Sequence, residues 1–284
     1  MELDDLRTQI DKVDNQLHDL LMERAEIVLE IGKYKAKSTQ PIFHPARQMK
    51  ILRRLIARHQ GSFPKEVLLR LWTEMMGAFI RMQGDFKVAV YMPERGSGYI
   101  EIARDSFGAY TPIVDCGIVG EVIDSVKSNQ SSVGIIPVSR NENEAPWWLG
   151  LLSSRKDTDL RVIARLPVGG AGEGRGEGKE AYALAKMPYE ETGKDNSLLA
   201  LETKGSVSIS ALKAIFDEAD IKVKNIVDKY DMPDESHAFL LEVSGYMGNE
   251  DARLEKIRKK KDSKISLLTV IGGYAVPFSA KELK

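Results

Sequence analysis

Two cations share one line on the first predicted helix of this 284-residue chain. Arg24 and Lys35 lie eleven residues apart, in a segment whose apolar residues include Ile27, Val28 and Ile31. Because each helical residue turns by about 100°, Lys35 returns to within about 20° of Arg24, roughly 16 Å along the axis. Two long cationic side chains placed in this way predict a site that holds a small anionic ligand at both ends.

Arg7 stands apart from this pair. It precedes Arg24 by seventeen residues, which places it about 25 Å away and about a quarter turn round the helix. That separation keeps Arg7 from a ligand between Arg24 and Lys35 in its own chain. In an antiparallel pair of such helices, however, Arg7 of one chain would reach the site of the other.

Other kinds of chemistry find little support in the sequence. It has no Ser/His/Asp or Cys/His pattern with a recognisable signature, and one cysteine with four scattered histidines predicts no metal cluster. The glycine-rich run 169–180 fits neither the dinucleotide fingerprint nor the P-loop, which needs Ser or Thr where Glu180 stands. We predict a flexible hairpin or linker there.

Composition is that of an ordinary soluble globular protein. Hydrophobic residues make up 43% and charged residues 29%, and a formal net charge of -1 favours neither nucleic acid nor an anionic membrane as a partner. The acidic, amphipathic start is unlike a signal peptide, and no apolar run approaches the length of a membrane span. Together with the single cysteine, these features predict a cytoplasmic protein.

The hydrophobic spacing of residues 1–85 predicts an all-α domain of three helices. The first covers about residues 3–37, the second begins at Pro45, and the third covers 65–83. The first helix would be roughly 50 Å long, so its apolar stripe stays exposed unless a second copy packs against it. That predicts a homodimer.

The rest of the chain is rich in predicted strands. Short β-rich runs, with helical candidates at 98–107 and 118–128, predict a small α/β lobe over residues 86–194. Residues 195–284 show the order β-α-β-β-α-β, which is the ferredoxin-like arrangement. The predicted fold class is therefore multidomain, with an all-α part, an α/β lobe and a ferredoxin-like α+β domain.

The N-terminal segment also resembles a known family. The runs "LRTQIDKVDNQLHDLL", "ERAEIVLEIGKYKAK" and "QPIFHPARQMKILRRL" are similar to the all-helical chorismate mutase domain in order, spacing and the loop between helices. The similarity covers about residues 2–85. It implies conversion of chorismate to prephenate without a cofactor, in an intertwined homodimer whose two sites each take residues from both chains.

The resemblance assigns roles to five polar residues. By position, Arg7 matches the arginine donated across the dimer, while Arg24 and Arg47 match those that bind the substrate carboxylates and their surroundings. Lys35 matches the lysine on the ether oxygen, and Gln83 matches the second donor to that oxygen. Because Gln83 is neutral, it can donate a hydrogen bond at any ordinary pH.

Three positions depart from the family pattern. Gln48 stands where a glutamate usually accepts a hydrogen bond from the substrate hydroxyl, so we expect weaker substrate binding. His44 lies near the place of an acidic residue that often assists this hydroxyl, and we interpret it first as a loop residue. At Phe79, a small or polar residue is commoner, so the pocket should differ in shape.

The implied reaction suits a site made of cations because it needs neither a nucleophile nor a proton transfer. Chorismate rearranges within one molecule, so the enzyme must hold a flexible dianion in its folded, reactive conformer. It must also place hydrogen-bond donors where negative charge grows as the C–O bond breaks. Arginine suits the carboxylates because its guanidinium group binds them in a bidentate manner.

The order of the three parts resembles bifunctional chorismate mutase–prephenate dehydratases, in which a dehydratase and an ACT regulatory domain follow the mutase. The Gly-Thr-Phe-Ser and Thr-Arg-Phe motifs of dehydratases are absent. We therefore predict an active mutase (1–85), a truncated and inactive dehydratase-like lobe (86–194) and an ACT-like domain (195–284). Two alternatives stay open: a divergent bifunctional enzyme, and a non-catalytic regulatory protein that senses an aromatic metabolite.

Overall fold

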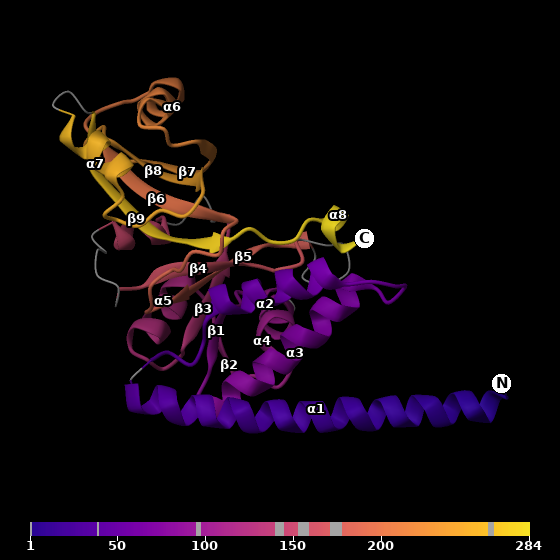
Figure 1. Cartoon of the computed structure of the whole chain (residues 1–284). Coiled ribbons are helices and arrows are strands. Elements are labelled where there is room, and N and C mark those ends of the chain that lie inside the picture. Colours follow the sequence, from indigo (N-terminus) through magenta and orange to yellow (C-terminus); the bar gives the residue numbers. More distant parts are fainter. Residues whose placement is uncertain are drawn as a thin grey trace.

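Three helices form the N-terminal part of the chain, and strands dominate the remainder (Figure 1). The computed structural model describes residues 2–38, 40–94, 98–139, 145–152, 159–170, 178–260 and 264–284. Most of the glycine-rich run that we predicted to be a hairpin or linker lies outside the described residues.

The three predicted helices are confirmed, with bounds close to those expected. They are α1 (Leu3–Ser38), α2 (Pro45–Arg58) and α3 (Lys65–Gln83). Pro45 is the first residue of α2, where the fixed φ of proline favours the helix and the missing N–H costs no hydrogen bond. Helix α1 crosses α3 closely, since a Cβ atom on Gly32 would lie 3.3 Å from the Cα of Gln83.

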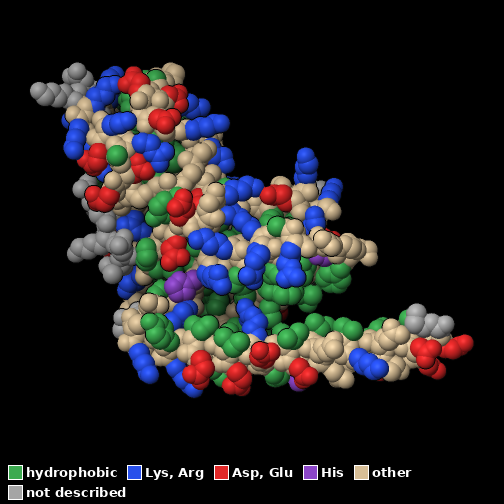
Figure 2. Space-filling view, in the orientation of Figure 1, with side chains coloured by type: hydrophobic (Ala, Val, Ile, Leu, Met, Phe, Trp, Pro, Cys, Tyr) green, Lys and Arg blue, Asp and Glu red, His purple; other side chains and the backbone are tan. Residues whose placement is uncertain are grey.

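The N-terminal half of α1 extends beyond the rest of its own chain (Figure 1). Every residue from 2 to 23 is exposed. Large apolar side chains line this segment with exposures between 41% and 61%: Leu3, Leu6, Ile10, Val13, Leu17, Leu20 and Leu21. Figure 2 shows hydrophobic side chains along one edge of α1 and acidic ones along the other. The exposed stripe expected from the sequence is thus present.

The strands form a single nine-stranded sheet with the order β2-β1-β3-β5-β4-β9-β6-β8-β7. Their bounds are β1 (Val88–Tyr91), β2 (Ile113–Cys116), β3 (Val133–Pro137), β4 (Arg161–Leu166), β5 (Ala181–Ala185), β6 (Asp195–Thr203), β7 (Val223–Asp231), β8 (His237–Ser244) and β9 (Ile265–Ala275). The helical segments between and after them are α4 (Tyr99–Phe107), α5 (Val119–Lys127), the 3₁₀ helix η1 (Trp147–Leu151), α6 (Ile209–Glu218), α7 (Ala252–Lys259) and α8 (Ala280–Leu283).

The two halves of the sheet differ in strand direction. In the first half, β1 runs parallel to both β2 and β3, and β5 pairs antiparallel with β3 and β4. In the second half, β9, β6, β8 and β7 are antiparallel neighbours, and the chain order is β-α-β-β-α-β. Phe216 of α6 and Leu254 of α7 pack with Leu199, Phe239 and Leu241 of this second half.

A short parallel contact between β4 and β9 joins the halves, with Val162 opposite Gly272. Gly272 has φ +131°, and a Cβ atom there would lie 2.1 Å from the carbonyl oxygen of Val162, so the approach requires glycine. One hydrophobic core, with Trp148 and Tyr182, continues across this seam. We predicted the lobe and the C-terminal unit as separate parts; in the structure they share one sheet, because long-range strand pairing joins them.

Candidate active site

A pocket of about 440 Å³ lies between the three N-terminal helices and the loop that joins α1 to α2. It brings together six of the seven predicted site residues: Arg24, Lys35, His44, Arg47, Gln48 and Gln83. Its apolar wall consists of Val28, Ile31, Ile42, Phe43, Ile51, Met76, Phe79 and Ile80. None of the fourteen described lining residues is Asp or Glu, so the pocket is positively charged and suits an anionic ligand.

Each helix contributes polar side chains from a different direction. Arg24 and Lys35 project from α1, whose close approach to α3 brings them near Gln83, the last residue of α3. Arg47 and Gln48 come from the first turn of α2. The convergence therefore depends on the way the three helices cross, not on any one of them.

Arg24 is held against an aromatic ring. Its guanidinium carbon lies 4.4 Å from the centroid of the Phe79 ring, which is a cation–π contact. Burial lowers the pKa of Arg24, and its Nη1 atom is buried without a hydrogen-bond partner among the described residues. A buried cationic donor without a partner is costly, so this atom indicates where an anion would bind.

Lys35 and Gln83 are held by backbone carbonyl groups. The ammonium group of Lys35 donates to the Ile42 oxygen at 3.1 Å, and burial lowers the pKa of this lysine. The Nε2 atom of Gln83 donates to the Phe79 oxygen at 3.0 Å, while its Oε1 atom is buried without a partner in the described part of the chain. Both side chains retain N–H groups for a ligand.

His44 connects the pocket to a distant part of the chain. Its Nδ1 atom lies 3.9 Å from Oε1 of Glu190, which belongs to the segment between β5 and β6. Burial, and next the charge of Lys35, lower the pKa of His44, while Glu190 acts in the opposite sense. The imidazole is therefore neutral near pH 7.

Arg7 is absent from the described lining of this pocket. It lies in the exposed half of α1 and forms a surface ion pair with Asp4 at 3.0 Å. This placement agrees with the expectation that Arg7 does not reach the site of its own chain.

Sequence reasoning missed two features of the pocket. It flagged Phe79 only as a departure from a pattern, whereas the ring supports the Arg24 guanidinium. It did not find Glu190, because no spacing signal connects that residue to His44 across so much intervening chain. A contact of either kind appears only when the helices and the sheet are packed together.

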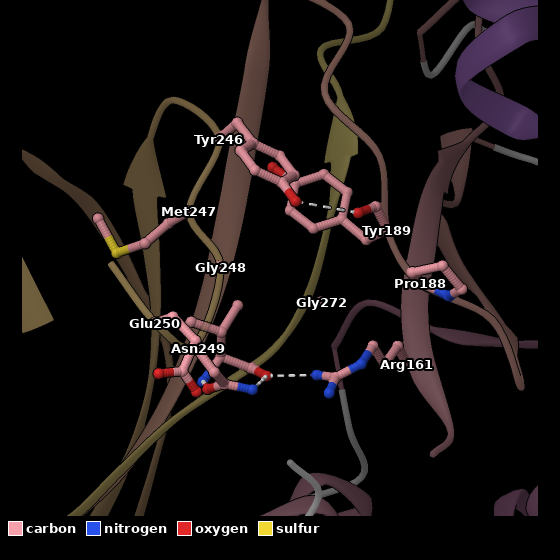
Figure 3. A pocket seen from close by; sticks show the side chains of 10 residues that line it. Arg161, Pro188, Tyr189, Tyr246, Met247, Gly248, Asn249, Glu250 and Gly272 are labelled. Carbon is pink, nitrogen blue, oxygen red and sulfur yellow. Dashed lines mark hydrogen bonds between the residues drawn. The ribbon is translucent and has the colours of Figure 1, made fainter. Parts of the chain in front are cut away.

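A second cavity, of about 410 Å³, lies at the seam of the sheet (Figure 3). Arg161 donates to the Val270 oxygen at 2.8 Å, and Asn249 exchanges hydrogen bonds with the backbone of Val270. The rings of Tyr189 and Tyr246 lie 4.7 Å apart. These polar groups hold neighbouring segments together.

Two other kinds of feature are absent from the described residues. No group of three or more His, Cys, Asp and Glu side chains is placed to hold a metal ion. No helix of that part of the chain combines the length and apolarity needed to cross a bilayer.

Residues 6–84 match the family model for chorismate mutase type II. This helical part of the chain is a chorismate mutase domain. The mutase pocket described above lies within the matched segment, apart from the contact with Glu190.

Two curated proteins are similar to parts of this chain. The bifunctional chorismate mutase/prephenate dehydratase of Aquifex aeolicus (strain VF5) is 29% identical over 141 residues, which are 48% of this chain and 39% of that protein. The T-protein of Enterobacter agglomerans is 42% identical over 78 residues, covering 26% of this chain and 21% of its own length. The chain thus spans about two fifths of the bifunctional relative and about a fifth of the T-protein.

A solved structure is also similar to part of the chain. A prephenate dehydratase from Streptococcus mutans has a TM-score of 0.47 and 18% identity, over 68% of this chain and 100% of that one.

Proposed function

We propose that this protein is a chorismate mutase, which converts chorismate to prephenate in aromatic amino-acid biosynthesis. The observation that carries the proposal is the convergence of Arg24, Lys35 and Arg47 in one pocket with no carboxylate in its described lining. The match of residues 6–84 to the type II mutase family supports it. A site of this kind suits a small dianion.

The pocket groups take complementary roles in this proposal. Arg24 and Arg47 bind the carboxylates, which holds chorismate in its folded conformer. Lys35 and Gln83 donate to the ether oxygen as the C–O bond breaks and negative charge grows there. To do so, Lys35 exchanges its hydrogen bond with the Ile42 carbonyl for one with the substrate. Gln48 and His44 face the substrate hydroxyl.

A homodimer would complete each site. The apolar stripe along residues 3–21 of α1 is exposed in the single chain, and burying such a stripe against a second copy is favourable. In an antiparallel pair of these helices, Arg7 of the partner would enter the open side of the pocket. The ion pair with Asp4 is exposed and therefore weak enough to exchange for a substrate carboxylate.

We infer that the remainder of the chain is a dehydratase-like lobe without dehydratase activity (86–194) and an ACT-like domain (195–284). The absence of the Gly-Thr-Phe-Ser and Thr-Arg-Phe motifs supports inactivity. The β-α-β-β-α-β order, with β9-β6-β8-β7 as neighbours, supports the ferredoxin-like ACT assignment. The single cysteine, free and buried, supports a cytoplasmic location.

Chorismate consumption by the full chain, followed by product analysis, tests this function. Prephenate as the only product supports the proposal. Phenylpyruvate would instead establish a bifunctional enzyme, the activity in the names of several relatives. An absence of turnover would contradict catalysis and favour the regulatory alternative. Gln48 and Phe79, which depart from the family pattern, support that alternative.

Mixing inactive variants tests the shared site. Refolding Arg7→Ala chains with Lys35→Ala chains should restore about a quarter of the wild-type rate, because half the dimers are mixed and each has one intact site. The control mixes Arg24→Ala with Lys35→Ala. In each site, Arg24 and Lys35 come from the same chain. No mixed dimer therefore has an intact site, and no activity should return. Equal results in both mixtures would contradict the shared site.

A further inference from the structure

Helix α2 has one side at the mutase pocket and another against the C-terminal half of the chain. Six residues separate Arg47 from Arg53, so helical geometry directs these side chains about 120° apart. Arg47 and Gln48 line the pocket. Met49 and Leu52 are buried in a hydrophobic core that adjoins the pocket, where Leu52 is 1% exposed.

Arg53 connects α2 to two segments of the C-terminal half. Its Nη1 atom donates to the oxygen and the Oγ1 of Thr192, at 3.3 and 2.8 Å. Its Nη2 atom donates to the oxygens of Lys194 and Val276, at 2.7 and 3.1 Å. Thr192 and Lys194 precede β6, and Val276 follows β9. One guanidinium group therefore holds both the entry and the exit of the ferredoxin-like unit.

The acceptors of Arg53 are themselves held in place. The buried carboxylate of Asp195 accepts hydrogen bonds from the backbone N–H groups of Thr192 and Gly193, at 2.8 and 3.0 Å. It also accepts one from the Thr192 hydroxyl. This turn keeps the carbonyl groups of residues 192 and 194 directed at α2, so Arg53 bonds to a rigid partner.

The C-terminal tail adds an apolar contact to the same side of α2. Phe278, 6% exposed, packs with Met49 and Leu52 of α2 and with Leu69 and Met76 of α3. Its N–H group donates to the Val168 oxygen at 2.8 Å. Figure 1 shows the tail and α8 beside the α2–α3 pair. Met76 also lines the mutase pocket, so this core and the pocket share a wall.

We propose that Arg53 and Phe278 are positioning residues of the mutase site, through which the C-terminal half of the chain holds α2 in register with α1 and α3. A shift of α2 would move Arg47 and Gln48 away from the Arg24 and Lys35 cations of α1. Because both ends of the ferredoxin-like unit meet at Arg53, that unit helps to set the position of α2 in the mutase site. The catalytic part of this inference rests on the proposed function.

The test uses the full chain with Arg53→Met, which keeps the aliphatic stem and removes the guanidinium group. Arg54→Met is the matched control, since Arg54 is the exposed neighbour on the same helix. We expect kcat/KM for chorismate to fall about tenfold in Arg53→Met, as for other small displacements of substrate-holding groups. Hydrogen exchange of the α2 amides should rise at least about tenfold. Both values should stay within about twofold in Arg54→Met.

Two further measurements separate positioning from a general loss of stability. Arg53→Lys retains a cation that can reach some of the same carbonyl groups, so it should recover part of kcat/KM. Combining Arg53→Met with Arg47→Lys should cost less than the two single effects multiplied, because both act on the same contact with substrate. A fully multiplicative result, or lower thermal stability with unchanged kinetics, would overturn the proposal.

Phe278 provides an independent arm. Phe278→Ala should raise the hydrogen exchange of α2 and lower kcat/KM. Phe278→Leu refills most of the core, so both quantities should lie close to their wild-type values. Phe63→Ala is the control, because Phe63 is 49% exposed in the α2–α3 connection. Suppose that the wild-type protein does not turn over chorismate but hydrogen exchange of α2 is faster in Phe278→Ala. The proposed function would then fail, while the role of Phe278 in holding α2 would be supported. If the wild-type protein turns over chorismate but α2 exchange in Phe278→Ala is unchanged, the proposed function stands and the positioning role of Phe278 fails.

Discussion

Two cavities of similar volume, about 440 Å³ in the helical part and about 410 Å³ at the seam of the sheet, have opposite chemistry. In the helical pocket, Nη1 of Arg24 and Oε1 of Gln83 are buried without a hydrogen-bond partner among the residues that the structure describes. At the seam, Arg161 and Asn249 bond to the backbone of Val270. Volume alone therefore does not distinguish the two cavities, whereas the unpaired polar atoms of Arg24 and Gln83 line only the helical pocket.

The two regions also differ in how they are stabilised. The seam depends on backbone contact, since Gly272 meets Val162 too closely for any side chain. The helical pocket lies where three helices meet. Burial desolvates Arg24 and Lys35 there, and none of the described lining residues is a carboxylate. The first arrangement suits a structural joint, and the second suits a binding site that an anionic ligand completes.

Removing a cation from the helical pocket should have the largest effect. Lys35→Ala should lower kcat/KM about 100- to 1000-fold, the usual effect of losing a donor to developing charge. Lys37→Ala, on the exposed end of the same helix, is the control and should leave the rate unchanged. Chorismate assays with a thermal melt of each variant make the comparison. Near-normal rates for Lys35→Ala would contradict the site assignment.

Alkaline pH should reproduce this effect without mutation. Burial lowers the pKa of Lys35 below its usual 10.5, and only the protonated amine carries a charge for the ether oxygen. As pH rises through the lowered pKa, kcat/KM should fall about tenfold per unit. The arginine of Lys35→Arg stays charged at high pH, so the residual kcat/KM of this variant should not fall over the same pH range. A fall that persists in Lys35→Arg would belong to another group.

At the seam, a substitution should change stability and leave activity alone. Asn249→Ala removes the hydrogen bonds to Val270 and should lower the free energy of unfolding by about 1 to 2 kcal/mol. Turnover of chorismate should stay at the wild-type value. Asn225→Ala, on the exposed edge strand β7, is the control. A large loss of turnover in Asn249→Ala would remove the distinction between the two cavities.

The smallest expected effect is a gain at Gln48. Gln48→Glu should lower KM for chorismate by about three- to tenfold, because a carboxylate accepts the hydroxyl hydrogen bond more strongly than an amide does. Gln60→Glu adds the same charge at an exposed position beyond α2 and serves as the control. An equal change in both variants would mean that net charge, and not the hydroxyl contact, decides KM.

Local signals in the sequence were sufficient to group most of the polar residues that line the helical pocket. The periodicity of α1 placed Arg24 and Lys35 on one line, and Pro45 marked the start of α2, which carries Arg47 and Gln48. Such signals succeed because helical geometry has a fixed repeat. The same repeat excluded Arg7 from the pocket of its own chain, and the structure agrees.

Long-range contacts were not predictable in the same way. Nothing local to β4 or β9 indicates that Val162 and Gly272 would join two units in one sheet. Nor does any spacing connect Arg53 to the carbonyl groups around Thr192 and Val276. Such pairings depend on how whole elements pack, and many packings share the same local pattern.

The sequence by itself therefore determined the three N-terminal helices, the order of the strands along the chain and which residues face a common side of α1. Tertiary structure alone decided that Phe79 supports the Arg24 guanidinium, that Glu190 lies near His44, and that Arg53 is held by the C-terminal half. The physical reason is that a repeat fixes direction within one element, whereas distance between elements is set by the packing of all of them.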